Sequence, residues 1–275
     1  MSEEAIQATA VDAISCKIYA VKHGYYEDDA LLKLLSRGTD TERKSPEIAR
    51  GTWARVQGTR QELRRFYEKN ASRRKVVINC GAGFDTTFWW AKSEGLFKDG
   101  EDLWFDLDME AVVRQRIRRL RMPAAKSLVS SLQNLKITDS KLASDAYQIR
   151  VLDMKRSEES AKLIEEIKEE YQIDDQTDVC LIFECVLVYM PTETSGRFLK
   201  AAADDFENLK VISYEQLNLN DRFGTVMLEN LVQRGCGLDG IDACLSKATQ
   251  IQRFERVGFR HVDSLRHHNS GEIER

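Results

Sequence analysis

The sequence predicts an α/β fold, a doubly wound and mostly parallel sheet preceded by a helical N-terminal cap. From residue 75 onward, short apolar runs alternate with helical segments, which is the order of repeated β-α-β units. The first run, residues 76–78, reads Val-Val-Ile, and consecutive β-branched residues are typical of a strand buried on both faces. Gly81-Ala82-Gly83 follows directly. It indicates either a plain tight turn or a nucleotide-type cofactor site at the carboxyl end of a parallel strand.

The composition is that of one large globular unit. The chain has 275 residues, of which 42% are hydrophobic, and its net charge of −4 does not indicate binding to nucleic acid or to a membrane surface. Residues 1–5 carry no basic cluster, and the longest apolar run, residues 179–190, is interrupted by Glu184. We therefore expect no export signal and no membrane span, and we expect a cytoplasmic protein.

The cysteines and histidines indicate which kinds of metal site and catalytic mechanism to expect. The six cysteines form no C-x-x-C pair, and the four histidines have no partners at the spacing of a metal site. We expect free thiols in a reducing compartment and no metal site. The scarcity of histidine also argues against a Ser-His-Asp or Cys-His mechanism.

The N-terminal region is expected to be a helical cap. Residues 1–70 precede the first clear strand and carry apolar side chains at helical spacing, whereas residues 71–275 are expected to form the core of the fold. Residues 43–56 are more basic and contain Trp53 between Arg50 and Arg55. The two arginines indicate either surface solubility or, since Trp53 suggests a packed segment, the binding of an anion.

The core is expected to alternate strands and helices after the first glycine turn. Strands are expected at residues 102–108, 147–152, 178–190, 209–215 and 259–265, and helices at 86–94, 111–121, 157–171, 191–206, 222–234 and 249–257. The helix at 111–121 carries the one basic run of the chain, Arg114, Arg116, Arg118, Arg119 and Arg121. This run predicts a solvated helix face or, as the alternative, a site for an acidic partner surface or RNA.

Polar residues stand where the predicted strands end. Asp108 lies 25 positions after Gly83, where a carboxylate can accept two hydrogen bonds from ribose hydroxyls. Asp106 or Asp108 could do this or cap the next helix, and the terminal position favours Asp108. Asp153 ends the next strand, and Glu184 must meet solvent or a ligand because an unpaired buried charge is costly.

The cofactor favoured by this pattern is S-adenosyl-L-methionine. Folds that bind NAD usually carry a third glycine at the position that is Thr86 here, and the chain has no Walker sequence for ATP. The sequence keeps an acid that would bind ribose hydroxyls and lacks the third glycine that would contact a pyrophosphate. This combination favours a cofactor that has an adenosine and no phosphates.

Several longer motifs carry a resemblance to a known family. They are R-K-S-P-E-I-A-R-G-T-W-A-R-V at 43–56, N-C-G-A-G-F-D-T-T-F-W at 79–89, E-C-V-L-V-Y-M at 184–190, Y-E-Q at 214–216 and D-R-F-G at 221–224. With Cys16-Lys17 and the stretch to about Val262, the chain resembles the leucine carboxyl methyltransferase family. The resemblance implies the class I S-adenosylmethionine-dependent methyltransferase fold. The implied activity is esterification of the C-terminal leucine of the protein phosphatase 2A catalytic subunit.

The resemblance also implies roles for residues around the cofactor. Lys17 and Arg55 are implied to bind the methionyl carboxylate region, Gly81 to contact the cofactor through its backbone, and Asp108 to bind the ribose. Glu184 is implied to lie near the methionyl amine.

The remaining implied roles concern the adenine and the acceptor. Asp153 and Met154 are implied to bracket the adenine, and Tyr189 to border the substrate tail together with Arg55. A C-terminal carboxylate is already ionised at neutral pH, so no catalytic base is expected and the residues would act by positioning.

Two rival functions stay open at this level. One is methyl transfer to another acceptor, such as a modified tRNA base, which the basic run at 114–121 could suit. The other is a non-catalytic binding protein, since members of the family continue past the sixth strand with a helix and a final antiparallel strand that we expect this sheet to lack. The expected partner is the tail of the phosphatase subunit, bound by a monomer.

Overall fold

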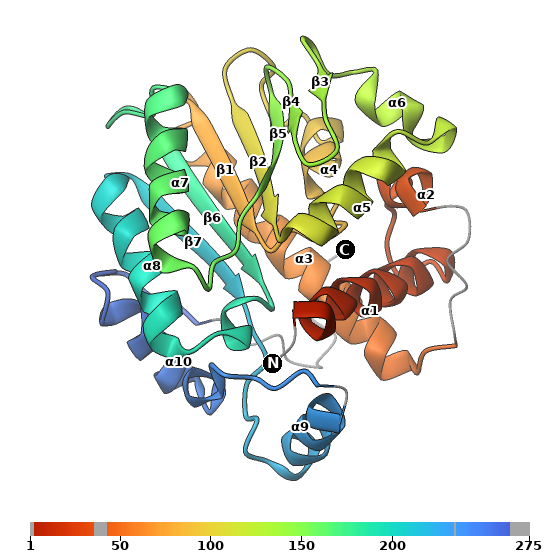
Figure 1. Cartoon of the computed structure of the whole chain (residues 1–275), viewed down its shortest axis with the longest axis vertical. Coiled ribbons are helices and arrows are strands. Elements are labelled where there is room, and N and C mark those ends of the chain that lie inside the picture. Colours follow the sequence, from red (N-terminus) through yellow and green to blue (C-terminus); the bar gives the residue numbers. More distant parts are fainter. Residues whose placement is uncertain (1–2, 36–42, 234, 265–275) are drawn as a thin grey trace.

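The computed structural model describes residues 3–35, 43–233 and 235–264, and within them the chain folds around a seven-stranded sheet (Figure 1). The strand order is β3-β4-β5-β2-β1-β6-β7. The strands are β1 (Lys75–Cys80), β2 (Leu103–Asp108), β3 (Lys136–Ile137), β4 (Leu142–Ala143), β5 (Tyr147–Val151), β6 (Asp178–Glu184) and β7 (Leu209–Tyr214). From β5 to β7 all neighbours are parallel, whereas β3 and β4 add a short antiparallel hairpin at one edge. The predicted doubly wound sheet is confirmed.

Helices cover both faces of this sheet (Figure 1). They are α1 (Glu3–Lys22), α2 (Asp29–Leu35), α3 (Pro46–Glu68), α4 (Thr87–Ser93), α5 (Glu110–Leu120), α6 (Lys126–Val129), α7 (Ser157–Glu170), α8 (Thr192–Asp205), α9 (Arg222–Gln233) and α10 (Lys247–Glu255). Short 3₁₀ segments are η1 (Pro123–Ala125), η2 (Leu187–Tyr189) and η3 (Ile241–Cys244). Helices α1 to α6 pack on one face and α7, α8 and α10 on the other.

Alternation along β1 explains why its central residues, 76–78, are all apolar. Val77 points into the core that the first six helices share, whereas Val76 and Ile78 point into the opposite core beneath α7 and α8. Successive side chains of a strand point to opposite faces, so a strand in a sheet covered on both sides buries apolar residues in both directions. The polar side chains of β1 are also buried, and each has a partner, Lys75 with Asp178 and Asn79 with Asp106.

The chain reverses its winding direction next to β1. Strand β1 pairs with β2 on one side and with β6 on the other, so the connections leave the two strands in opposite directions. In open α/β sheets this switch point opens a crevice at the carboxyl ends of the strands. Helix α1 lies across these ends, and its residues help to line the cavity found there (Figure 1).

Two expected strands differ from the structure. The strand expected at 178–190 ends at Glu184, and η2 follows, so Glu184 is a terminal residue of β6 and not an interior one. Residues 259–264 of the expected strand at 259–265 form no strand, and residue 265 lies outside the described range. Phe259 and Val262 are three positions apart and both pack on the core beneath α8, a spacing that strand alternation does not allow.

Helices α1 to α3 share one apolar core with the sheet, although the division of the chain at residue 70 stays a prediction. Ile14 and Ile18 of α1 and Leu63 of α3 pack in the same cluster as Val77 and Trp104 of the strands. None of the described helices is both long enough and apolar enough to cross a membrane.

Candidate functional site

A cavity of about 160 Å³ lies at the switch point of the sheet. Its walls come from α1, α3, the glycine turn after β1, and the segments after β2, β5 and β6. All eight residues predicted for the site line it, namely Lys17, Arg55, Gly81, Asp108, Asp153, Met154, Glu184 and Tyr189. Residues separated by more than 170 positions in the sequence are therefore brought to one place.

The glycine turn is specified by its backbone and by a close neighbour. Gly81 has φ +66° and Gly83 has φ +53°, a region that side chains with a Cβ rarely adopt. A Cβ on Gly81 would lie 2.6 Å from Cγ2 of Val186, a residue of the segment after β6. The turn therefore keeps its backbone exposed to the cavity only if residue 81 has no side chain.

Asp108 joins this turn to the end of β2. Its Oδ2 accepts a hydrogen bond from the backbone N–H of Gly83 at 2.6 Å, and its Oδ1 accepts one from the N–H of Met109 at 2.7 Å. Burial raises the pKa of Asp108 to about 6. Asp106, which the sequence left as an alternative, is directed into the core and pairs there with Arg116. Of the two acids, Asp108 is the one in the cavity wall.

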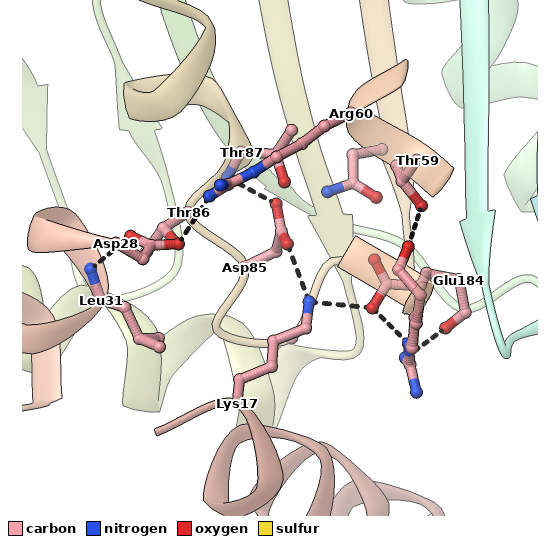
Figure 2. Close-up of polar contacts among 12 residues, drawn as sticks. Lys17, Asp28, Leu31, Thr59, Arg60, Asp85, Thr86, Thr87 and Glu184 are labelled. Atoms are coloured by element: carbon pink, nitrogen blue, oxygen red, sulfur yellow. Dashed lines mark hydrogen bonds and ion pairs between the residues drawn. The ribbon is translucent and has the colours of Figure 1, made fainter. Parts of the chain in front are cut away.

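Opposite charges meet at the end of the cavity near β6 (Figure 2). Nζ of Lys17 lies 2.8 Å from Oε1 of Glu184 and 3.1 Å from Oδ2 of Asp85. Nε of Arg55 donates to the same Oε1, and Nη2 of Arg55 donates to the backbone oxygen of Glu184 at 3.1 Å. Two cations and two carboxylates from α1, α3, β6 and the glycine turn thus form one compact cluster.

The pairing keeps all four of these groups ionised. Burial alone would lower the pKa of Lys17, but Glu184 and Asp85 outweigh it and raise that pKa. Burial alone would raise the pKa of Asp85, but Lys17 and the hydrogen bonds from Thr87 bring it down to about 2. The pKa of Glu184 is lowered in the same way, because Arg55 and Lys17 outweigh its burial.

Helix α3 places Arg50 and Arg55 in different environments. Ser45 begins the helix by accepting a hydrogen bond from the N–H of Ile48, and Pro46 stands at its first position, where a missing N–H costs nothing. From this start Arg50 is exposed on the surface, whereas Arg55 points inward, with only 21% of its side chain exposed. Arg50 is therefore a surface residue, whereas Arg55 is held inside the protein by Glu184, and its binding of an anionic ligand stays a prediction.

The far end of the cavity is formed after β5. Asp153 accepts a hydrogen bond from the N–H of Lys155 at 3.0 Å and lies 3.4 Å from Nε of Arg156. Met154 is buried beside Leu152 in the same wall. This end combines the apolar Leu152 and Met154 with Asp153 and Lys155, in contrast to the end near Glu184, where four charged side chains meet.

Tyr189 stands in η2, close to the charged end. Its N–H donates to the backbone oxygen of Val186 at 3.1 Å, and burial raises the pKa of the phenol to about 12. The thiol of Cys185 lines the same wall, and burial raises its pKa to about 12. Among the described lining residues there is no histidine, and the buried thiol stays protonated at neutral pH. This part of the wall thus offers positioning and fixed charge, and neither its phenol nor its thiol is deprotonated at neutral pH.

Sequence reasoning missed two residues that shape the site. One is Asp85, whose Oδ1 accepts the N–H of Thr87 at 2.8 Å at the start of α4 and whose Oδ2 pairs with Lys17. Arg116 was expected in a solvated or partner-binding run, but it is fully buried. A signal was present, since Arg116 lies at helical spacing with the buried residues Val112, Val113 and Leu120.

The rest of the basic run is not one free face. Arg114 pairs with Glu110 at 2.7 Å, Arg121 pairs with Asp139 at 2.7 Å, and Arg119 lies over the ring of Phe84. The prediction of a solvated face is therefore wrong for Arg116, which belongs to the core, whereas Arg118 is exposed and the side chains of Arg114 and Arg121 are each 43% exposed.

Comparison with known proteins agrees with the geometry. A family model described as leucine carboxyl methyltransferase matches residues 5–203. Leucine carboxyl methyltransferase 1 of Rattus norvegicus is 37% identical over 255 residues, covering 91% of this chain and 74% of the rat protein. That of Bos taurus is 35% identical over 267 residues, covering 96% and 77%. The tRNA wybutosine-synthesizing protein 4 of Homo sapiens is 26% identical over 261 residues, covering 93% of this chain and 37% of the human protein.

A solved structure supports the fold. A protein of Thermobifida fusca YX, described as a methyltransferase, superposes with a TM-score of 0.54 at 12% identity, covering 82% of this chain and 78% of the other. The sheet order, the switch-point cavity and the match over residues 5–203 lead to one conclusion. This chain has a methyltransferase fold and belongs to the leucine carboxyl methyltransferase family.

Proposed function

We propose that this protein transfers a methyl group from S-adenosyl-L-methionine to the α-carboxylate of a C-terminal leucine, that of the protein phosphatase 2A catalytic subunit. The observation that carries the proposal is the cluster of Lys17, Arg55, Asp85 and Glu184 beside the glycine turn. A methionyl group presents an ammonium and a carboxylate together, and a cluster with both signs of charge suits such a zwitterion.

The residues present fit the adenosine half of the donor as well. Asp108 is fixed by the glycine turn at the end of β2, where its carboxylate is in place to accept ribose hydroxyls. Asp153 and the apolar Met154 form the wall that would face the adenine. Thr86 stands where a third glycine would be, and its hydroxyl is bound to Asp28 at 2.8 Å, so this turn is not open to a pyrophosphate.

The proposed reaction needs the protein mainly to position the two reactants. The bound donor supplies a methyl group on a sulfonium sulfur. An acceptor carboxyl group with a pKa of about 3.5 is ionised at neutral pH, so no side chain has to remove a proton. This chain's residues would hold the two partners in line and keep water out, and α1 lies where such a cover is needed.

The acceptor is proposed to enter beside η2. Tyr189, Val186 and Met190 form an apolar wall next to the charged end of the cavity. An apolar leucine side chain suits this wall, and the guanidinium of Arg55 stands near enough to attract its carboxylate. The names of the rat and bovine relatives support leucine as the acceptor.

The deciding experiment is transfer of labelled methyl from S-adenosyl-L-methionine to the purified phosphatase subunit. We expect base-labile label, as for a methyl ester, on the intact subunit and none on a subunit whose last leucine has been removed. Equal labelling of both subunits would contradict the proposed acceptor. A parallel reaction with tRNA tests the rival acceptor, and labelling there alone would replace the proposal.

A further inference from the structure

Arg116 is among the largest side chains that are almost completely buried in the described part of the chain. It comes from α5, and it is 1% exposed. Its Nη1 donates to the backbone oxygen of Gly83 at 2.7 Å, and its Nη2 donates to the backbone oxygen of Asp85 at 2.5 Å. Both oxygens belong to the glycine turn that lines the cavity. A buried arginine therefore reaches the turn from the side opposite to the cavity.

The turn is held from two directions at the same residue. On the cavity side the N–H of Gly83 donates to Asp108, and on the core side the C=O of Gly83 accepts from Arg116. Buried carbonyl oxygens need a donor, and this loop has left the sheet that would otherwise provide one. A guanidinium with several donors in one plane can satisfy two carbonyls at once, which a lysine ammonium does with poorer geometry.

A counter-ion makes this arrangement possible in the core. Oδ2 of Asp106 lies 2.5 Å from Nη2 of Arg116, and Tyr147 donates its hydroxyl to the same carboxylate. Oδ1 of Asp106 accepts from Nε1 of Trp104 at 2.9 Å and from Nδ2 of Asn79 at 3.2 Å. The carboxylate is thus fixed by β1, β2 and β5, and Arg116 is fixed by the carboxylate.

We propose that Arg116 is a positioning residue for the cofactor, which sets the conformation of the turn at 81–85 through the carbonyl oxygens of Gly83 and Asp85. The conformation of this turn then sets the positions of three groups: the backbone of Gly81, the carboxylate of Asp85 that pairs with Lys17, and the N–H of Gly83 that donates to Asp108. Arg116 itself is not among the residues that line the cavity. The effect on cofactor affinity rests on the proposed function, because it assumes that this cavity binds S-adenosyl-L-methionine.

The test compares Arg116→Lys with a matched control, Arg150→Lys. Arg150 is also a buried arginine, 7% exposed, and its Nη2 bonds Glu170 at 2.7 Å and the hydroxyl of Tyr171 at 3.0 Å, away from the cavity wall. The probe is S-adenosylhomocysteine, titrated calorimetrically, with thermal unfolding of both variants and the KM for the phosphatase acceptor measured beside it. We expect Arg116→Lys to weaken the Kd about tenfold and Arg150→Lys to leave it unchanged, with the acceptor KM within about twofold of the parent in both.

A second variant guards against failure to fold. Arg116→Gln combined with Asp106→Asn removes both charges, so no unpaired ion is left in the core. We expect the same loss of affinity of about tenfold, because the two carbonyl contacts are still lost. A Kd equal to that of Arg150→Lys in either variant would overturn the proposal.

Hydrogen exchange separates this proposal from the proposed function. Without any ligand, amides at 81–86 should exchange faster in Arg116→Lys than in the parent and in Arg150→Lys. Unchanged exchange at 81–86 would overturn the positioning role. If the parent protein binds no S-adenosylhomocysteine, the proposed donor fails, while the exchange result still decides what Arg116 does.

Discussion

Arg55 of α3 and Glu184 of β6 are joined at two points, by Nε to the carboxylate and by Nη2 to the backbone oxygen at 3.1 Å. These residues are 129 positions apart in the sequence. The contact fixes α3 against β6, and Cζ of Arg55 lies over the ring of Tyr214, 5.9 Å from the ring centre. The guanidinium of Arg55, which would attract an acceptor carboxylate, is therefore held by Glu184, whose carboxylate would face the donor.

The first prediction is that Arg55→Ala loses activity while the fold stays intact. Glu184 keeps Lys17 as its partner at 2.8 Å, so the substitution does not leave an unpaired charge in the core. We expect kcat/KM for methyl transfer to fall about 100-fold, with an unchanged circular dichroism spectrum. Arg50→Ala is the control, because Arg50 lies on the same helix and is exposed. Normal turnover by Arg55→Ala would remove the role assigned to this site.

The second prediction concerns pH and Asp108. Burial raises the pKa of this carboxyl to about 6, so it takes up a proton as the pH falls through 6, whereas accepting ribose hydroxyls needs the ionised form. Asp85 and Glu184 have lowered pKa values and stay ionised over this range. Affinity for S-adenosylhomocysteine, measured calorimetrically, should weaken about tenfold from pH 7 to pH 5. Asp108→Asn should bind weakly at both values; a steep pH dependence in that variant would assign the proton to another group.

Local patterns were enough to predict most of the fold. The apolar run at 76–78 and the turn after it form β1 and the glycine turn, because consecutive β-branched apolar residues are typical of a strand buried on both faces. Residues 259–264 differ, since a strand exists only where a neighbour pairs with it, and a window of sequence does not contain the neighbour. The hairpin of β3 and β4 was not predicted, because each strand has only two residues.

The site was predictable where residues stand at strand ends and less so where partners are distant. Asp108, Asp153 and Glu184 follow strands, so their meeting at one edge follows from parallel topology. The sequence could not show that Lys17 bridges Asp85 and Glu184, because those contacts join segments 68 or more positions apart. Arg116 and Arg118 look alike in a basic run, and only the helical phase separates the buried one from the exposed one.

The third prediction is that Gly81→Ala closes the turn to the cofactor. The added methyl would lie 2.6 Å from Val186, and φ +66° is unfavourable for alanine. We expect a loss of about 1–3 kcal/mol in the free energy of unfolding, and loss of S-adenosylhomocysteine binding. Gly51→Ala is the matched control, because Gly51 lies in α3 and a Cβ there meets nothing within 4 Å. That control should gain about 0.5–1 kcal/mol from helix propensity. Equal stability of the two variants would show that Val186 does not press on the turn.

The fourth prediction concerns Glu215, which follows β7 and supports the segment after β6. Its Oε1 accepts the backbone N–H groups of Val186 at 3.1 Å and Leu187 at 2.8 Å, whereas its buried Oε2 has no hydrogen-bond partner among the described residues. Burial raises the pKa of Glu215 to about 7. The folded state therefore holds a proton that the unfolded chain releases near pH 4.5, and the stability that Glu215 contributes is lost as the pH rises from about 4.5 through 7.

Glu215→Gln keeps one acceptor oxygen and carries no charge, so it should escape this loss. Urea unfolding at pH 8 should show the variant to be more stable than the parent by about 3 kcal/mol, and the difference should fall to about 1 kcal/mol at pH 5. Glu207→Gln is the control, because Glu207 is exposed, and it should match the parent at both values. A difference for Glu215→Gln that is the same at pH 5 and pH 8 would mean that this carboxyl is not the group that titrates, and that its two backbone hydrogen bonds alone set its contribution.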